Sequence, residues 1–187
     1  PAWKHLAISN AGMGDHSKLL VGFKEPYWNT RHGRNGTGFS DSALIQSTWE
    51  VNPSKSSSTH AVLAGYSGGV QARSRKPTTA QMDARSFLGY LEEVLPGAND
   101  AAKRNEAGEV LAHTANWSSN PFSKGSHTVN RPGYFTTIAH NEAKPIGNLF
   151  FAGEHTSSFY EWQGFMEGAA LSGLRAASEV YSMARVR

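Results

Sequence analysis

Asn148-Leu-Phe-Phe-Ala-Gly-Glu-His-Thr156 carries the clearest structural signal in the chain. The apolar run from Leu149 to Phe151 is typical of a short buried strand. Gly153 then allows a sharp turn and a close approach by a ligand, because it has no Cβ. Glu154 follows directly, so the sequence predicts a carboxylate at the tip of a strand.

A helix is predicted after this stretch, beginning near Trp162 to Phe165 and ending at about Ser182. Its small residues share one face, so another element should pack very close to the helix backbone. These residues are Ala169, Ala170, Ser172, Gly173, Ala176 and Ala177. A carboxylate and a helix N-terminus in one crevice suit a ligand with hydroxyl groups and negative charge. From the pattern alone, an ordinary strand-loop-helix unit is the alternative.

The residues of these two stretches closely resemble the C-terminal signature of the flavin-containing amine oxidases. The shared sequences are Phe-Ala-Gly-Glu, Gly-Phe-Met-Glu-Gly-Ala and Ser-Gly-x-Arg-Ala-Ala. The family includes monoamine, polyamine and L-amino-acid oxidases. The resemblance implies that Gly153 and Glu154 contact the ribityl and pyrophosphate region of FAD. It also implies that the backbone of Met166 faces the flavin O2 atom, where the helix dipole favours negative charge.

A second block near the N-terminus resembles the same family. Lys18 begins an apolar run that ends at Phe23, which predicts a buried strand stopped by Glu25-Pro26. In the family, a lysine at the head of this strand reaches toward flavin N5 through a water, and the resemblance gives that role to Lys18. The alternative is a lysine that flanks a strand at the surface, as lysines commonly do.

The third block is Trp117-Ser-Ser-Asn-Pro-Phe-Ser-Lys-Gly-Ser-His127. It resembles the family segment Trp-x-x-x-Pro-x-x-x-Gly-x-Tyr, which returns from the substrate domain to the flavin domain. In the family the last aromatic residue forms one wall of a cage around the amine, and His127 replaces it here. The preceding residue, which carries a covalent flavin in some monoamine oxidases, is Ser126. Alone, Trp117 could be a core or interface aromatic, and His127 a surface histidine.

The resemblance therefore implies a set of site residues. Lys18 is the expected catalytic residue, and the expected walls of the substrate cavity are His127, Trp162 and Phe165. The residues expected to contact FAD are Trp117, Gly153, Glu154, Gly164, Phe165 and Met166. The chain contains no Cys, which excludes a cysteine-linked flavin and thiolate metal sites within it. We expect FAD to be bound non-covalently, and we expect no metal site.

The remaining segments predict an antiparallel sheet with one amphipathic helix. Strands are expected at residues 3–9, 43–51, 60–66 and 109–115, with a turn at Ser67–Gly69, a Ser-rich loop at 53–59 and a connector at 99–108. Thr78 or Thr79 is the expected N-cap of a helix that ends at Pro96-Gly97. Arg131-Pro-Gly-Tyr-Phe should precede a short turn or helix.

The composition is globular and argues against several classes of protein. The chain has 187 residues, 39% of them hydrophobic, and a net charge of +3. Its basic residues are scattered, with the densest group at Arg73–Lys76, so no nucleic-acid-binding stripe is predicted. No run of about 20 apolar residues occurs, so no membrane-spanning helix is predicted. No targeting signal is visible, and the sequence leaves the localisation open.

The nucleotide-binding fingerprint Gly-x-Gly-x-x-Gly is absent, and Gly65-Tyr-Ser-Gly-Gly69 has the wrong spacing. In the family that fingerprint lies near the N-terminus of a polypeptide more than twice as long. We therefore expect an α+β fold that is part of a two-domain FAD-dependent amine oxidase. Residues 1–118 would form the C-terminal half of an antiparallel-sheet substrate domain. Residues 119–187 would supply the last strand and helix of a Rossmann-like FAD domain.

The resulting hypothesis is a C-terminal chain or fragment of an FAD-dependent amine or L-amino-acid oxidase. Such an enzyme converts an amine to an imine and O2 to hydrogen peroxide. Activity would require an N-terminal chain or segment that carries the glycine-rich fingerprint. The other expected partners are a small amine or amino acid and O2, with neither nucleic acid nor membrane. Two alternatives stay open: an amino-acid monooxygenase on the same scaffold, and a non-catalytic binding fragment.

Overall fold

The computed structural model describes residues 1–42, 44–51, 60–74, 79–157 and 162–185. The described residues fall into two compact units, one made of Pro1–Gly14 and Gly125–Arg187 and the other of Asp15–Lys124. The Ser-rich loop expected at residues 53–59 and the alternative N-cap Thr78 lie outside the described residues.

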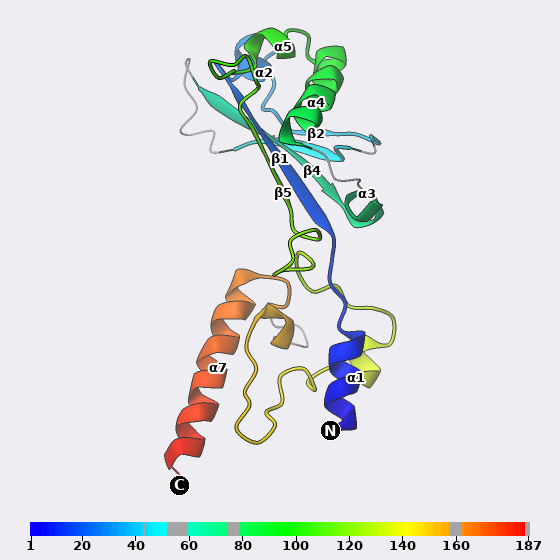
Figure 1. Cartoon of the computed structure of the whole chain (residues 1–187), viewed down its shortest axis with the longest axis vertical. Coiled ribbons are helices and arrows are strands. Elements are labelled where there is room, and N and C mark those ends of the chain that lie inside the picture. Colours follow the sequence, from blue (N-terminus) through cyan, green and yellow to red (C-terminus); the bar gives the residue numbers. More distant parts are fainter. Residues whose placement is uncertain (43, 52–59, 75–78, 158–161, 186–187) are drawn as a thin grey trace. The chain divides into compact units, whose positions relative to one another are not determined.

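The described part of residues 15–124 contains a five-stranded antiparallel sheet (Figure 1). The order across the sheet is β2-β3-β4-β1-β5, and every neighbouring pair is antiparallel. The strands are β1 (His16–Phe23), β2 (Gly38–Phe39), β3 (Ser47–Glu50), β4 (Ala61–Gly68) and β5 (Ala112–Asn116). The predicted antiparallel sheet is confirmed, with β3, β4 and β5 each displaced by a few residues from their expected bounds.

The turn predicted at Ser67–Gly69 is wrong in part. β4 continues to Gly68, which lies opposite His16 in the register with β1. Pairing with β1 keeps this part of the chain extended, and α3 (Gly69–Ser74) begins directly after it. Gly69, with a φ of 61°, makes the change of direction that the sequence assigned to the whole tripeptide.

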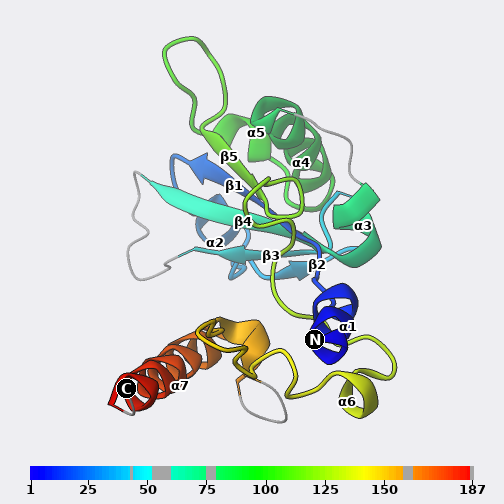
Figure 2. The same ribbon diagram turned by 60° about the horizontal axis from the view of Figure 1, so that its bottom comes forward.

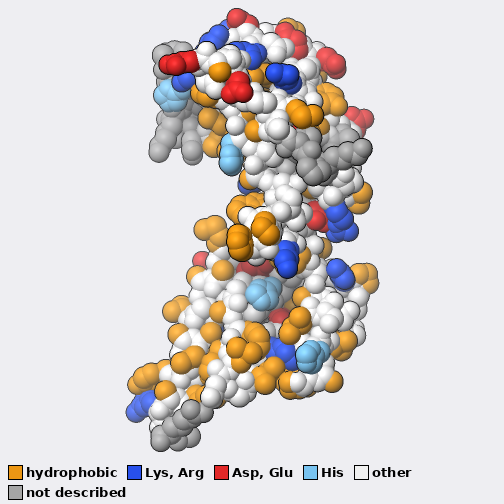
Figure 3. Space-filling view, in the orientation of Figure 1, with side chains coloured by type: hydrophobic (Ala, Val, Ile, Leu, Met, Phe, Trp, Pro, Cys, Tyr) orange, Lys and Arg blue, Asp and Glu red, His pale blue; other side chains and the backbone are white. Residues whose placement is uncertain are grey.

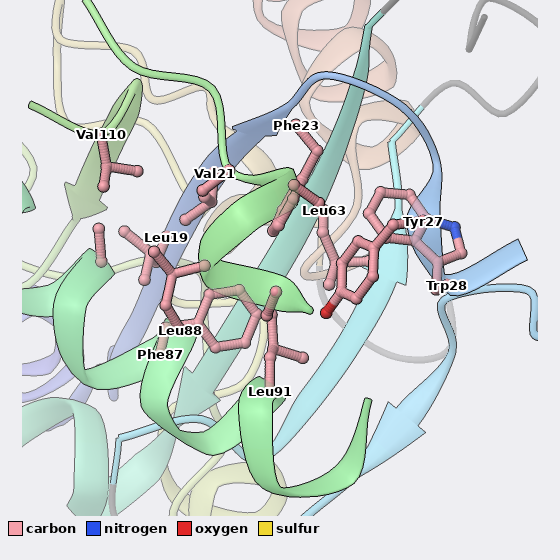
Figure 4. Close-up of a cluster of buried hydrophobic side chains, with 14 of the residues drawn as sticks. Leu19, Val21, Phe23, Tyr27, Trp28, Leu63, Phe87, Leu88, Leu91 and Val110 are labelled. Atoms are coloured by element: carbon pink, nitrogen blue, oxygen red, sulfur yellow. The ribbon is translucent and has the colours of Figure 1, made fainter. Parts of the chain in front are cut away.

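The core of this unit lies between one face of the sheet and α4 (Ala80–Val94) (Figure 4). Alternate residues of β1 are fully buried on this face, as a half-buried strand requires: Leu19, Val21 and Phe23. The helix contributes Phe87, Leu88 and Leu91, and α2 (Tyr27–Thr30) contributes Tyr27 and Trp28. Each large apolar side chain buried here stabilises the fold by about 1.5–3 kcal/mol.

α4 begins where the sequence predicts it. Thr79 is the N-cap, and its hydroxyl accepts a hydrogen bond of 3.2 Å from the backbone N–H of Met82. Such a cap is worth typically ~1 kcal/mol. The connector expected at residues 99–108 starts inside a short helix, α5 (Ala98–Ala101), which follows Gly97 in a left-handed conformation.

The other unit contains α1 (Ala2–Asn10), α6 (Tyr134–Thr137), a 3₁₀ turn η2 (Glu154–Thr156) and α7 (Met166–Arg185) (Figure 2). The strand predicted at residues 3–9 is wrong, because this segment is helix α1. Its buried residues are Lys4 and Ala7, which lie three positions apart and therefore on one face of a helix. A short apolar run fits both the two-residue period of a strand and the 3.6-residue period of a helix, and here tertiary contacts decided in favour of the helix.

α7 confirms the predicted helix, beginning at Met166 and continuing to Arg185. Within the described residues, its buried positions are Gly168 and Ser172. A Cβ on Gly168 would overlap the carbonyl group of Trp162, in the loop that leads into the helix, so the close contact at Gly168 is local. Much of the predicted small-residue face is exposed, and apolar side chains follow the helix (Figure 3): Leu171, Leu174, Val180 and Tyr181.

The buried strand predicted at residues 149–151 does not form. Among the described residues, Leu149 makes a single bridge with Ile146, and its side chain is 57% exposed. A strand is stabilised by hydrogen bonds to neighbouring strands. The local sequence has the composition of a strand, but the described residues contain no neighbouring strand with which this segment pairs.

The expected domain boundary between residues 118 and 119 differs from the boundaries between the compact units. These units divide the chain after Gly14 and after Lys124, and they group Pro1–Gly14 with the C-terminal segment. The assignment of the units to a substrate domain and an FAD domain stays a prediction.

Candidate functional site

A short backbone pairing positions His127. The backbone N–H of Gly14 donates to the carbonyl of His127 at 2.7 Å, and Val129 donates to the carbonyl of Gly12 at 3.0 Å. A Cβ on Gly12 would overlap the carbonyl oxygen of Val129, so the two segments approach this closely only with glycine. The His127 ring is half-buried, and its Nδ1 lies 2.9 Å from the carbonyl oxygen of Thr128.

The carboxylate of Glu154 joins three segments of this unit. Its Oε1 accepts hydrogen bonds from the backbone N–H and the hydroxyl of Thr128, at 2.8 and 2.9 Å. Its Oε2 accepts one of 2.6 Å from the backbone N–H of Gly164. Both oxygens are therefore engaged inside this chain, and the predicted contact of Glu154 with FAD stays a prediction. Hydrogen bonds to a charged group are worth about 1.5–3 kcal/mol each.

Helix α7 holds the turn at Gly153. The backbone N–H of Gly153 donates to the Ser172 hydroxyl at 2.9 Å, and Arg175 donates to the carbonyl of Phe151 at 2.9 Å. Arg175 also donates to the hydroxyl of Thr156 at 3.1 Å. Gly153 has a φ of 120°, a conformation that residues with a Cβ rarely adopt. The turn and the helix therefore form one hydrogen-bonded structure.

These roles of Ser172 and Arg175 are not among the predictions from sequence. Ser172 was predicted only as a small residue of the helix face, and both residues belong to the segment Ser-Gly-x-Arg-Ala-Ala that resembles the family signature. Their spacing of three residues places them on one face of the helix, which is a signal that both contact the same segment.

The loop before α7 brings several predicted site residues together. The rings of Trp162 and Phe165 meet edge to face, with their centroids 6.0 Å apart. A Cβ on Gly164 would lie 3.8 Å from Nδ1 of His127, so this loop and the histidine are neighbours. Phe165 is 61% exposed and Met166 is 89% exposed. The start of α7 thus presents apolar side chains and the positive end of a helix dipole at the surface of this unit.

Lys18 and Trp117 belong to the other compact unit. Lys18 is exposed on β1 between two buried residues, so it lies on the sheet face opposite the core. Its register partners are Tyr66 and Ala115, and its Nζ lies 5.7 Å from the ring centroid of Trp49. The backbone N–H of Trp117 donates to the carbonyl of His16 at 3.3 Å. Their placement beside the other predicted site residues stays a prediction.

A cavity of about 690 Å³ lies in the same unit, beside α4 and β2. Its apolar lining includes Phe39, Phe87 and Leu91, and its charged lining is Arg34, Asp41 and Glu93. Among the described residues that line it, none is a predicted site residue, so the cavity is not part of the candidate site.

In the described ranges, no group of three or more His, Asp or Glu side chains is placed to hold a metal ion. No described helix combines the length and apolar character needed to cross a bilayer.

Comparison with known proteins decides the family. The sequence pattern of the family described as flavin containing amine oxidoreductase matches residues 1–181. The chain belongs to the flavin-containing amine oxidoreductase family. It is 28% identical over 181 residues to amine oxidase [flavin-containing] B of Cavia porcellus, covering 96% of this chain and 33% of that protein. A flavin-containing amine oxidase of Oncorhynchus mykiss is 28% identical over 188 residues, covering 100% of this chain and 34% of that protein.

This family member spans about a third of the length of the curated relatives it matches. Its fold is that of part of the cyclohexylamine oxidase from Brevibacterium oxydans, with a TM-score of 0.79 at 23% identity over 99% of this chain and 39% of that one. Wild-type putrescine oxidase bound to putrescine gives a TM-score of 0.76 at 19% identity, over 97% and 38% of the two chains. The predicted α+β fold and the predicted family are therefore confirmed.

Membership of this amine oxidoreductase family implies a flavin cofactor. The residues at the start of α7 fit a ring with a negatively charged edge, since the N-terminus of a 20-residue helix carries partial positive charge. Glu154 does not oppose this fit, because N–H and O–H donors already bind both of its oxygens. Gly153 and Gly164 both have positive φ angles, which residues with a Cβ rarely adopt. A Cβ on Gly153 would overlap the ring of His155, so this histidine covers one side of the turn.

Proposed function

We propose that this chain supplies the C-terminal part of an FAD-dependent oxidase that acts on small amines or L-amino acids. The reaction converts the amine to an imine and O2 to hydrogen peroxide, and FAD is bound non-covalently. The observation that carries the proposal is the Glu154 carboxylate, which ties the His127 segment to the loop that begins α7. FAD, when bound, would supply the two-electron oxidation.

The residues that would hold FAD are Trp117, Gly153, Glu154, Gly164, Phe165 and Met166. The positive end of the α7 dipole favours negative charge at the ring edge. The Gly153 turn, held by Ser172, places Glu154 where its carboxylate binds the loop before α7. The absence of Cys and the presence of Ser126 support a cofactor that is not linked through sulfur to this chain.

The substrate would lie against His127, Trp162 and Phe165, whose apolar surface excludes bulk water and positions the amine. Nδ1 of His127 carries a hydrogen, because its neighbour at 2.9 Å is a carbonyl oxygen, which can only accept. The hydrogen bond to the backbone therefore sets the orientation of the ring. This wall of the substrate cavity would be an imidazole, where the family segment has the phenol of a tyrosine.

Lys18 would act from the sheet. Its ammonium group is a compact positive charge with three donors, so it can order a water and favour negative charge that develops during reaction with O2. Lys18 is exposed on β1, on the sheet face opposite Leu19 and Val21, so its side chain is not part of the main apolar core. Replacement of Lys18 should therefore affect turnover rather than folding.

An N-terminal chain or segment with the glycine-rich fingerprint would complete the cofactor site. This part of the proposal is supported by the absence of that fingerprint from the chain, since it supplies the pyrophosphate site in dinucleotide-binding folds. It is also supported by the exposed apolar side chains along α7, which a further element would cover.

The test is to purify the native protein with everything that co-purifies with it. Its visible absorbance is recorded, and peroxide formation is measured with monoamines, polyamines and L-amino acids. Bound flavin and peroxide with one of these classes support the proposal. An anaerobic reaction serves as the control, because peroxide must depend on O2.

Two outcomes would replace this proposal. An amide product formed with decarboxylation of an amino acid would identify a monooxygenase. A protein with neither flavin nor any complementing chain, and unable to take up added FAD, would be a non-catalytic binding fragment.

A further inference from the structure

A buried polar cluster lies next to the candidate site, in the unit that contains α1 and α6. Lys4, Tyr134 and Glu142 are 3%, 4% and 8% exposed. Nζ of Lys4 donates to the carbonyl oxygen of Glu142 at 2.9 Å and lies 3.7 Å from the ring centroid of Phe151. Burial lowers the pKa of Lys4, and the charge of Glu142 opposes this shift. Burying such groups is costly unless they are paired, so their arrangement requires an explanation.

The hydroxyl of Tyr134 has a defined direction. It donates its one hydrogen to Oε1 of Glu142, so its oxygen can only accept from the amide of Gln163, 2.9 Å away. Burial and the hydrogen bond to Glu142 both raise the pKa of Tyr134, and the phenol therefore keeps its hydrogen.

The direction of the Tyr134 hydroxyl sets the orientation of the Gln163 side chain. Nε2 of Gln163 donates to Tyr134 and to the carbonyl of His155, the latter at 3.3 Å. Its Oε1 accepts from the side-chain amide of Asn130 at 2.8 Å. A flipped amide would place two acceptors together at Tyr134 and two donors together at Asn130.

The cluster is not explained by stability alone. Within the described residues, Oε2 of Glu142 is buried without a hydrogen-bond partner. An incompletely satisfied buried carboxylate is a weak source of stability, whereas buried polar groups can select one conformation over others. The conformation selected here is that of Gln163, which immediately precedes Gly164, Phe165 and Met166.

We propose that Tyr134 and Glu142 are positioning residues, which act through Gln163 to hold the loop that presents Phe165 and Met166. This role deepens the proposed function and rests on it, because that function places substrate and cofactor against these two residues. Lys4 supports the cluster by binding the backbone of Glu142. Neither Tyr134 nor Glu142 needs to touch substrate.

The first experiment replaces Tyr134 by Phe, which removes only the hydroxyl. The native protein is labelled with 5-fluorotryptophan, and the ¹⁹F resonance of Trp162 is assigned with a Trp162→Phe variant. The Trp162 resonance should shift or split in Tyr134→Phe, while that of Trp28, buried in the other unit, stays in place. KM should rise roughly two- to ten-fold, the effect of one lost hydrogen bond, with flavin content retained. Tyr90→Phe, at an exposed position on α4 in the other unit, is the matched control and should change neither the Trp162 resonance nor KM.

The second experiment separates positioning from general destabilisation. Glu142→Gln keeps an acceptor for Tyr134 and should preserve the Trp162 resonance, whereas Glu142→Leu should alter it. If Tyr134 acts through Gln163, the double variant Tyr134→Phe/Gln163→Leu should raise KM no more than Gln163→Leu alone. Additive effects would overturn the proposal. An unchanged Trp162 resonance and KM in Tyr134→Phe, with only a lower Tm, would overturn it as well.

The failure of this inference can be distinguished from failure of the proposed function. Absence of amine oxidation would remove the proposed function, but the ¹⁹F signal of Trp162 would still report whether Tyr134 holds the loop. Normal amine oxidation with an unaffected Trp162 signal would remove the inference alone.

Discussion

The backbone N–H of Gly164 donates a hydrogen bond of 2.6 Å to the carboxylate of Glu154, ten positions earlier in the chain. The other oxygen of that carboxylate binds Thr128, the residue after His127. A single side chain therefore sets the distance between the segment that carries His127 and the loop that begins α7. Glu154 is therefore a structural link within the candidate site, and it is also a predicted contact of the cofactor.

Glu154→Ala should loosen both segments and weaken flavin binding. The loss of charge-assisted hydrogen bonds should cost about 1.5–3 kcal/mol, which corresponds to about ten-fold or more in cofactor affinity. The measurements are Tm and the flavin retained after dialysis. Glu106→Ala is the control, because Glu106 is an exposed acid in the other compact unit. Unchanged Tm and flavin content in Glu154→Ala would contradict the prediction.

Ser172→Ala should destabilise the Gly153 turn. The lost bond to the backbone N–H of Gly153 should lower the free energy of unfolding by about 0.5–1.5 kcal/mol, measured by chemical denaturation. Ser178→Ala makes the same chemical change at an exposed position of the same helix and should have little effect. Equal effects of the two substitutions would show that the bond to Gly153 contributes nothing measurable.

Lys18→Met should leave folding and flavin content nearly intact, because Lys18 is exposed on the sheet. Turnover should fall by one to several orders of magnitude, at roughly 1.4 kcal/mol per order. Stopped-flow measurements would follow flavin reduction by amine and reoxidation by O2 separately. The oxidative step should suffer at least as much as the reductive step.

Lys24→Met is the matched control for Lys18, since Lys24 directly follows the same strand and donates to the carbonyl of Asp100. It should leave both half-reactions unchanged. Parent rates in Lys18→Met would make Lys18 an ordinary surface lysine.

Phe165→Ala should change substrate specificity more than stability. Phe165 is mostly exposed in this unit, so its removal creates no large cavity in the described core. KM should rise or the preferred amine should change, as measured with a panel of amines at constant flavin content. Phe122→Ala, at another exposed phenylalanine, is the control. Normal kinetics per folded molecule together with a lower Tm would assign Phe165 to packing.

Any flavin should be released from this chain by acid precipitation, because the chain has no Cys and has Ser126 beside His127. The measurement is the visible absorbance of the supernatant together with the intact mass of the precipitated chain. A mass increase equal to that of a flavin would contradict the prediction and would direct attention to histidine residues.

Local pattern was sufficient for several elements of the fold. The cap at Thr79 and the apolar positions of α4 predicted that helix because both signals act within a few residues. β1 and α7 were predicted for the same reason, β1 from an apolar run stopped by Glu25-Pro26 and α7 from a long helical segment. The family could also be recognised in advance, because its three blocks retain their residue types and order.

Tertiary structure decided what depended on residues far apart in the chain. The segment of α1 was predicted as a strand, although its short apolar run fits the period of a helix as well as that of a strand. Burial of Lys4 and Ala7 on one face accompanies the helix that forms. Leu149–Phe151 has the composition of a strand but lacks a sheet among the described residues. Composition expresses a preference, whereas strand formation requires a hydrogen-bonded neighbour.

The candidate site divides in the same way. The sequence by itself determined which residue types are available: Glu154, His127, the Gly164–Met166 segment and no Cys. Only the tertiary structure decided that Glu154 binds Thr128 and Gly164, and that Tyr134 orients Gln163. The physical reason is that hydrogen bonds depend on distance and direction between groups, and a linear pattern specifies neither for residues brought together only by folding.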